Sequence, residues 1–107
     1  MQTFRILLIF ILASAGCATH FQRDEPEAIL FYLREPKANQ VQIAASYNGY
    51  TLQPAKRQNL NLWITRMPKG IDFSYFYLVD GIFFLPDCTL MEKDDFGQAN
   101  CVFSPMP

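Results

Sequence analysis

The feature that most constrains this fold is an Asp-Gly pair between two apolar runs in the second half of the chain. Residues Phe73–Val79 (FSYFYLV) precede the pair Asp80-Gly81, and residues Ile82–Leu85 (IFFL) follow it. Asp-Gly suits the positive φ values of a type I′ turn, and this turn joins antiparallel strands. The pattern therefore predicts a β-hairpin at residues 73–85.

Four other segments have the length and composition of short strands bounded by turn residues. They are Ala28–Leu33, Gln40–Ser46, Asn61–Met67 and Asn100–Ser104. Two polar segments, residues 51–59 and 86–98, are expected to be irregular loops. The chain shows no sustained helical period. We therefore expect an all-β domain, a β-sandwich of about six to eight short strands.

The N-terminus has the pattern of a secretory signal peptide. Arg5 precedes an unbroken apolar run, Ile6–Leu12, and small residues follow it as far as Cys17. The run is too short to span a ~30 Å hydrocarbon core, which needs about 20 apolar residues. We expect residues 1–16 to be removed, which leaves about 91 residues, the size of one domain.

The residues before Cys17 resemble a bacterial lipobox, in which the cysteine becomes the lipid-modified first residue of the mature chain. Ser14 stands where leucine is usual, so the alternative is cleavage after Ala15 and a soluble periplasmic or secreted protein. Ala18 follows the cysteine where an aspartate would retain such a protein in the inner membrane. The resemblance therefore implies lipid anchoring through Cys17, in the outer membrane and facing the periplasm.

The segment after the lipid site is polar. Residues 17–27 are expected to be a tether, and the domain is expected at residues 28–107. The tether holds His20, the only histidine, and no cluster of metal-ligating residues accompanies it in the sequence. We therefore expect no metal site there.

The other two cysteines form an even pair if Cys17 carries lipid. Cysteine pairs in exported proteins become disulfides, so we expect a bond between Cys88 and Cys101. The bond would close a loop of about 14 residues and contribute on the order of 3 kcal/mol in the chain-entropy model. Two free, buried thiols are the alternative.

Composition and spacing argue against two classes of function. The formal net charge is −1, so nucleic acid is not an expected partner. Ser46, Ser74 and Ser104 have no general base near them in the sequence. Asp94 and Asp95 are adjacent, so an extended chain would point them to opposite sides. We expect a solvated acidic loop, no enzymatic activity and no cofactor; a weak calcium site in that loop is a remote alternative.

Five short motifs follow one another between residues 41 and 104. They are Val41–Tyr50 (VQIAASYNGY), Met67–Gly70 (MPKG), Tyr75–Gly81 (YFYLVDG), Pro86-Asp87 and Asp94–Val102 (DDFGQANCV). The ordered series resembles the early-set immunoglobulin-like domain at the N-terminus of isoamylases and branching enzymes. The same fold serves as the glycogen-binding module of the AMP-activated protein kinase beta subunit, a family-48 carbohydrate-binding module.

The resemblance assigns faces to one strand and leaves another open. Tyr75, Tyr77 and Val79 share one side of an extended strand, and this side matches the core face of the family. In the strand at residues 61–67, the face that holds Trp63 competes with an equally apolar opposite face. Packing is the expected role of Trp63, but the sequence does not select its face.

The resemblance also implies a binding site. In the members that bind sugar, two tryptophans stack on glucose rings, while a lysine and an asparagine contact hydroxyl groups. The tryptophan positions correspond to Tyr50 and Phe83, the lysine to Phe76 and the asparagine to Asn100. We expect a site for glycogen or another α-glucan, weakened by the loss of the lysine. The alternative is an exposed aromatic patch that binds a protein partner in the envelope and has lost sugar binding.

Overall fold

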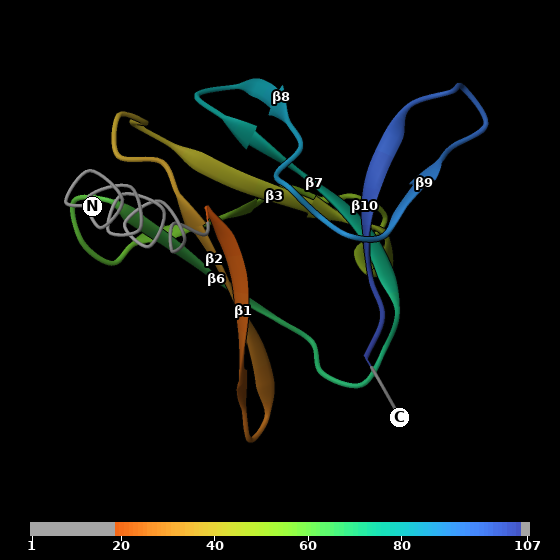
Figure 1. Ribbon diagram of the computed structural model, residues 1–107, viewed down its shortest axis with the longest axis horizontal. Coiled ribbons are helices and arrows are strands. Elements are labelled where there is room, and N and C mark those ends of the chain that lie inside the picture. Colours follow the sequence, from red (N-terminus) through yellow and green to blue (C-terminus); the bar gives the residue numbers. More distant parts are fainter. Residues whose placement is uncertain (1–18, 106–107) are drawn as a thin grey trace, which may run out of the picture.

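The computed structural model describes residues 19–105, which form two antiparallel sheets packed against one another (Figure 1). One sheet has the strand order β1-β2-β6-β5; the other has the order β4-β3-β7-β10-β9, and β8 also pairs with β7. The strands are β1 (His20–Glu25), β2 (Ala28–Arg34), β3 (Val41–Ala45), β4 (Gln53–Pro54), β5 (Lys56–Arg57), β6 (Leu62–Met67), β7 (Phe73–Val79), β8 (Ile82–Phe84), β9 (Met91–Lys93) and β10 (Ala99–Phe103). The predicted all-β class is confirmed.

The core lies between the two sheets and is built from alternate residues of their strands. Tyr75 and Tyr77 of β7 are each 1% exposed, which confirms the predicted core face of this strand. Trp63 also faces the core, where its indole Nε1 donates a hydrogen bond to the carbonyl oxygen of Glu35 at 3.0 Å. The buried cluster comprises Ile29, Phe31, Leu33, Ala38, Val41, Ile43, Ala45, Trp63, Met67, Phe73, Tyr75, Tyr77 and Cys101.

The predicted hairpin is confirmed. β7 and β8 pair antiparallel, and the two residues between them have positive φ, 52° at Asp80 and 79° at Gly81. These are the backbone signs of a type I′ turn. The Asp80 carboxylate also accepts hydrogen bonds from the backbone N–H groups of Asn39 and Gln40, both at 2.8 Å. The turn is thereby fixed to the start of β3.

The expected tether is wrong for residues 20–25, which form the edge strand β1 instead. β1 pairs with β2 over six residues, and Phe21 stacks on its cross-strand partner Tyr32 with ring centroids 4.7 Å apart. His20 points the other way, into the space between the sheets, where it contacts Phe31 and Tyr77. An edge strand can be held by its backbone and one anchoring face, so its sequence can stay polar.

Three further strands lie in segments that were expected to be loops. β4 and β5 are two residues each and flank Ala55, and β9 is three exposed residues long. Such strands bury too little side-chain surface to leave a periodic pattern in the sequence.

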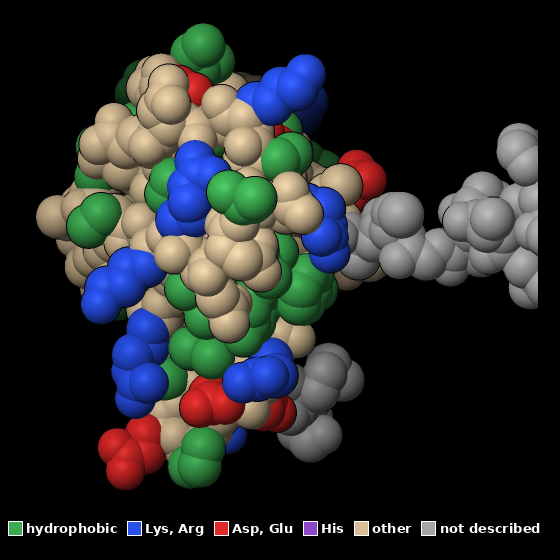
Figure 2. All heavy atoms as spheres, turned by 90° about the vertical axis from the view of Figure 1, so that its left-hand side faces the viewer, with side chains coloured by type: hydrophobic (Ala, Val, Ile, Leu, Met, Phe, Trp, Pro, Cys, Tyr) green, Lys and Arg blue, Asp and Glu red, His purple; other side chains and the backbone are tan. Residues whose placement is uncertain are grey.

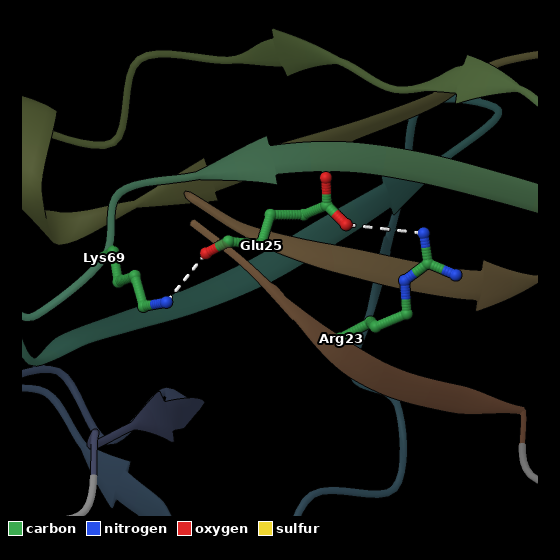
Figure 3. A network of polar contacts seen from close by, with 3 residues as sticks. All are labelled: Arg23, Glu25 and Lys69. Carbon is green, nitrogen blue, oxygen red and sulfur yellow. Dashed lines mark hydrogen bonds and ion pairs between the residues drawn. The ribbon is translucent and has the colours of Figure 1, made fainter. Parts of the chain in front are cut away.

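A small polar network links β1 to the turn after β6 (Figure 3). Lys69, in the turn after β6, donates from Nζ to the carbonyl oxygen of Glu25 at 2.7 Å. The Glu25 carboxylate is 3.4 Å from the Arg23 guanidinium. Exposed ion pairs of this kind add little stability, so the network positions the β1–β2 turn more than it strengthens the fold.

The N-terminal predictions lie outside the described residues. The signal peptide at residues 1–16 and the lipid on Cys17 therefore stay predictions. Within residues 19–105, no helix is long and apolar enough to span a membrane.

Candidate functional site

The structure brings three predicted site residues together on the outer face of the β7 sheet. Phe76 is on β7, Phe83 is on β8, and Tyr50 follows the short 3₁₀ turn at Ser46–Asn48. The ring centroids of Tyr50 and Phe76 are 6.0 Å apart at an interplanar angle of 17°, and those of Phe76 and Phe83 are 5.1 Å apart at 35°. We call these three residues the aromatic row.

Phe76 occupies the point where β7 changes its pairing partner. β10 pairs with residues 73–75 of β7, while β8 pairs with residues 77–79. Phe76 lies between these two stretches and is opposite Ala44 of β3 on the other edge. A small side chain opposite and a change of partner beside it leave the Phe76 ring partly open to solvent.

Tyr50 is held in place by backbone geometry and by its hydroxyl. Its φ is 63°, which is uncommon for a residue with a side chain, and it follows Gly49 at 71°. Its N–H donates to the carbonyl oxygen of Ala45 at 2.9 Å, and its hydroxyl lies 2.8 Å from the Ser74 hydroxyl. The ring is still 39% exposed. The predicted Asn-Gly turn therefore directs the Tyr50 ring across the outer face of the sheet.

Asn100, the fourth predicted residue, lies beside the row on β10. It is 4% exposed, and its side-chain oxygen is buried with no hydrogen-bond partner among the described residues. A buried polar atom without a partner costs about 1–3 kcal/mol. Buried polar atoms without a partner are few in folded proteins, and each calls for an explanation, such as an ordered water molecule or a bound ligand.

A groove of about 300 Å³ adjoins the aromatic row. Its far wall is the tip of the β9–β10 hairpin, which sequence reasoning did not place at the site. The Asp94 carboxylate accepts hydrogen bonds from the N–H groups of Phe96 and Gln98, both at 2.9 Å, and this shapes the tip. Phe96 itself is 95% exposed. We call this the aromatic groove; its lining is Tyr50, Phe76, Asp94, Asp95, Phe96, Gln98 and Asn100.

The predicted disulfide fixes this hairpin to the sheet. Cys88 and Cys101 are bonded, with their Cα atoms 5.9 Å apart. Cys101 is fully buried in the core and is directly opposite Met91 in the β9–β10 pairing. The bond therefore closes the chain around the segment that forms the wall of the groove.

His20 lies in a second cavity of about 300 Å³ at the open edge of the sandwich. Its Nε2 is 3.2 Å from the hydroxyl of Tyr77. Burial lowers the pKa of His20 to about 4, so the imidazole is neutral at physiological pH. Burial also raises the pKa of Tyr77. The histidine is therefore a half-buried part of the folded domain rather than part of a tether.

The serine positions have structural partners. The Ser74 hydroxyl is hydrogen-bonded to the Tyr50 hydroxyl, and the Ser46 hydroxyl accepts a hydrogen bond from the Ser74 N–H at 3.0 Å. Ser104 lines the same cavity as His20, but its hydroxyl is bonded to Asp72 at 3.2 Å. Within residues 19–105, no group of three or more His, Cys, Asp or Glu side chains is arranged to hold a metal ion.

Comparison of the chain with models of known protein families and with curated proteins finds no match to either. The fold by itself defines a domain of two packed antiparallel sheets with an aromatic groove on one outer face.

Proposed function

We propose that this protein is a non-catalytic, lipid-anchored protein of the cell envelope whose domain binds a carbohydrate at the aromatic groove. The domain would act in the manner of the early-set, glycogen-binding family that its motifs resemble. The observation that carries the proposal is the aromatic row beside Asn100, an acceptor that has no partner. Lipid anchoring rests on the sequence before Cys17.

The chemistry of the groove suits a sugar. Pyranose rings present apolar C–H faces to aromatic rings and hydroxyl groups at their edges, so a sugar site combines aromatic surface with a few fixed polar groups. Tyr50 and Phe83 are 39% and 40% exposed, which leaves ring surface for stacking. The positive φ of Tyr50 is a strained conformation of the kind that is retained at binding sites.

A binding measurement tests the proposal. The mature protein is titrated with glycogen fragments and with other oligosaccharides by calorimetry, alongside Tyr50→Ala and Phe83→Ala. We expect each variant to bind about fivefold to tenfold more weakly, because one aromatic contact contributes on the order of 1 kcal/mol and its loss opens the site to water.

The matched control is Phe21→Ala, which removes a stacked aromatic ring from the other sheet. We expect it to bind like the unmodified protein. If the folded, unmodified domain binds no oligosaccharide, or if all three variants lose affinity equally, the carbohydrate proposal is wrong.

The second candidate function is binding of a protein partner, and one observation favours it. Phe96 at the tip of one hairpin and Ile82 at the turn of the other are both strongly exposed apolar side chains. Apolar and aromatic residues of this kind are enriched at protein interfaces. Photo-crosslinking from position 96 in intact cells would yield one stoichiometric envelope protein if this function holds, and only diffuse products if it does not.

The anchor has its own test. Mass spectrometry of the mature N-terminus would show acyl chains on Cys17 if the lipobox is used. An unmodified chain that begins at Gly16 would contradict lipid anchoring and leave the binding proposal intact.

A further inference from the structure

We propose that the sugar bound at the aromatic groove carries free, positively charged amino groups. The inference rests on the proposed carbohydrate site and specifies its ligand class: an amino-sugar oligosaccharide with unacetylated amines rather than a neutral glucan. It is carried by the charge of the groove and by the unpartnered oxygen of Asn100.

The polar groups of the groove are dominated by hydrogen-bond acceptors. Asp95 is exposed and makes no hydrogen bond or ion pair with any described residue. The side-chain oxygen of Asn100 is an unused acceptor, and the Asp94 carboxylate also lines the groove. No lysine or arginine lines the groove in the described part of the chain.

Charge is divided between the two halves of the domain. Residues 28–70 hold six lysines and arginines against one glutamate, and residues 71–105 hold six aspartates and glutamates against one lysine. Basic side chains are spread over the side of the molecule away from β9 and β10 (Figure 2). The groove belongs to the acidic part, apart from Tyr50. This separation would attract a cation to the groove and orient it there, despite a net charge near zero.

The ring geometry selects a sugar rather than an isolated cation. A site that encloses a lone ammonium group surrounds it with aromatic faces at steep angles. Here the rings of Tyr50 and Phe76 are nearly parallel, at 17°, and Phe83 continues the row at 35° to Phe76. A row of this kind suits successive sugar rings. The amine at a ring edge would then reach the exposed carboxylate of Asp95 at the wall of the groove.

The test uses three oligosaccharides of equal length. Fully deacetylated chitosan oligosaccharide and its N-acetylated counterpart share a backbone and differ only in the amine, and a maltooligosaccharide represents neutral glucans. Calorimetry is done at mildly acidic pH, where the amines are charged. We expect the free amine to bind about tenfold more tightly than the acetylated form, and the difference to shrink in high salt.

Variants locate the effect. Asp95→Asn should remove most of the preference for the amine over the acetylated sugar. Asp94 is unsuitable for this purpose, because its carboxylate shapes the hairpin tip. Glu27→Gln is the matched control, since it neutralises an exposed carboxylate in the β1–β2 turn and should leave the preference intact.

The outcomes separate the two proposals. If the acetylated or neutral sugar binds at least as tightly as the amine, and Tyr50→Ala abolishes this binding, the inference fails and the carbohydrate site stands. If no sugar binds in a manner that depends on Tyr50, both proposals fail. A short lysine peptide that binds as tightly as the amino sugar would overturn the inference, because charge alone would then be sufficient.

Discussion

The two faces of β7 use similar residues for opposite purposes. Tyr75 and Tyr77 point inward and are 1% exposed, while Phe76 between them points outward and belongs to the aromatic row. The inner rings meet other rings edge-on, as Tyr75 meets Phe31 at 5.1 Å. The outer ring lies where the strand changes its pairing partner. The neighbours of an aromatic residue in this strand, rather than its own chemistry, therefore decide whether it is buried in the core or lies on the outer face.

The largest expected effect separates the two faces directly. Tyr77→Ala should lower the free energy of unfolding by about 4 kcal/mol, because it removes a fully buried ring and leaves a cavity. Phe76→Ala should lower it by only about 1 kcal/mol, because the ring is partly exposed and water fills its place. Urea unfolding followed by fluorescence measures both. Equal losses would show that Phe76 is a packing residue.

Acid should lower the free energy of unfolding, because His20 is partly buried between the sheets. The pKa of this histidine is about 4 in the folded protein and 6.5 in an unfolded chain. Between these values the unfolded chain binds the proton and the folded protein does not, so stability falls as the pH falls from 6.5 to 4. The loss is on the order of 3 kcal/mol.

The measurement is the difference between the unmodified protein and His20→Phe, which keeps a ring and does not titrate. Between pH 6.5 and pH 4, the free energy of unfolding of the unmodified protein should fall by this amount relative to that of His20→Phe. Parallel pH profiles for the two proteins would show that the imidazole is not buried as described.

Removing the disulfide should destabilise the β9–β10 hairpin more than the core of the sandwich. Replacement of Cys88 and Cys101 by serine should cost about 3 kcal/mol, and the loss should be accompanied by faster amide exchange in residues 90–100. The sheet around β3 and β7 should keep its protection. An equal increase in amide exchange across the whole domain would contradict the prediction that the disulfide mainly stabilises the hairpin.

The smallest effect concerns the turn that carries Phe83. Asp80→Asn keeps a residue that tolerates positive φ but weakens two hydrogen bonds to the start of β3. We expect a loss of about 1 kcal/mol by thermal unfolding. Asp80→Ala should lose more, because it also removes the tolerance for this backbone conformation.

The sequence predicted the parts of the fold that alternate strongly or carry a sharp turn. The strands around Ile43 and Tyr77 and the Asp-Gly turn had such patterns, and the disulfide had only one available pair outside the proposed lipid site. β1 was missed because Phe21 is its single strong hydrophobe and backbone pairing holds the rest. The face of Trp63 depended on register with β2, which a single strand does not reveal.

The candidate site was predicted only in part for a similar reason. The family resemblance supplied Tyr50, Phe76, Phe83 and Asn100, and the structure places them on one face. The opposite wall of the groove is the β9–β10 hairpin, in a segment for which the sequence predicts a solvated loop. The spacing of Asp94 and Gly97 was a sequence signal for a tight hairpin tip. The distance of that tip from Phe76, however, depends on how β9 pairs with β10, which the sequence does not reveal.

The position of Cys101 makes the two sulfurs of the disulfide unequal in their exposure. Its side chain has no surface in the finished domain, and its strand is enclosed between β7 and β9. In the closed domain an external thiol or oxidant has no direct access to this sulfur, whereas Cys88 is half-buried and lines the cavity that holds His20. A thiol that reduces the bond in the folded protein therefore has to attack the sulfur of Cys88, with Cys101 as the leaving group.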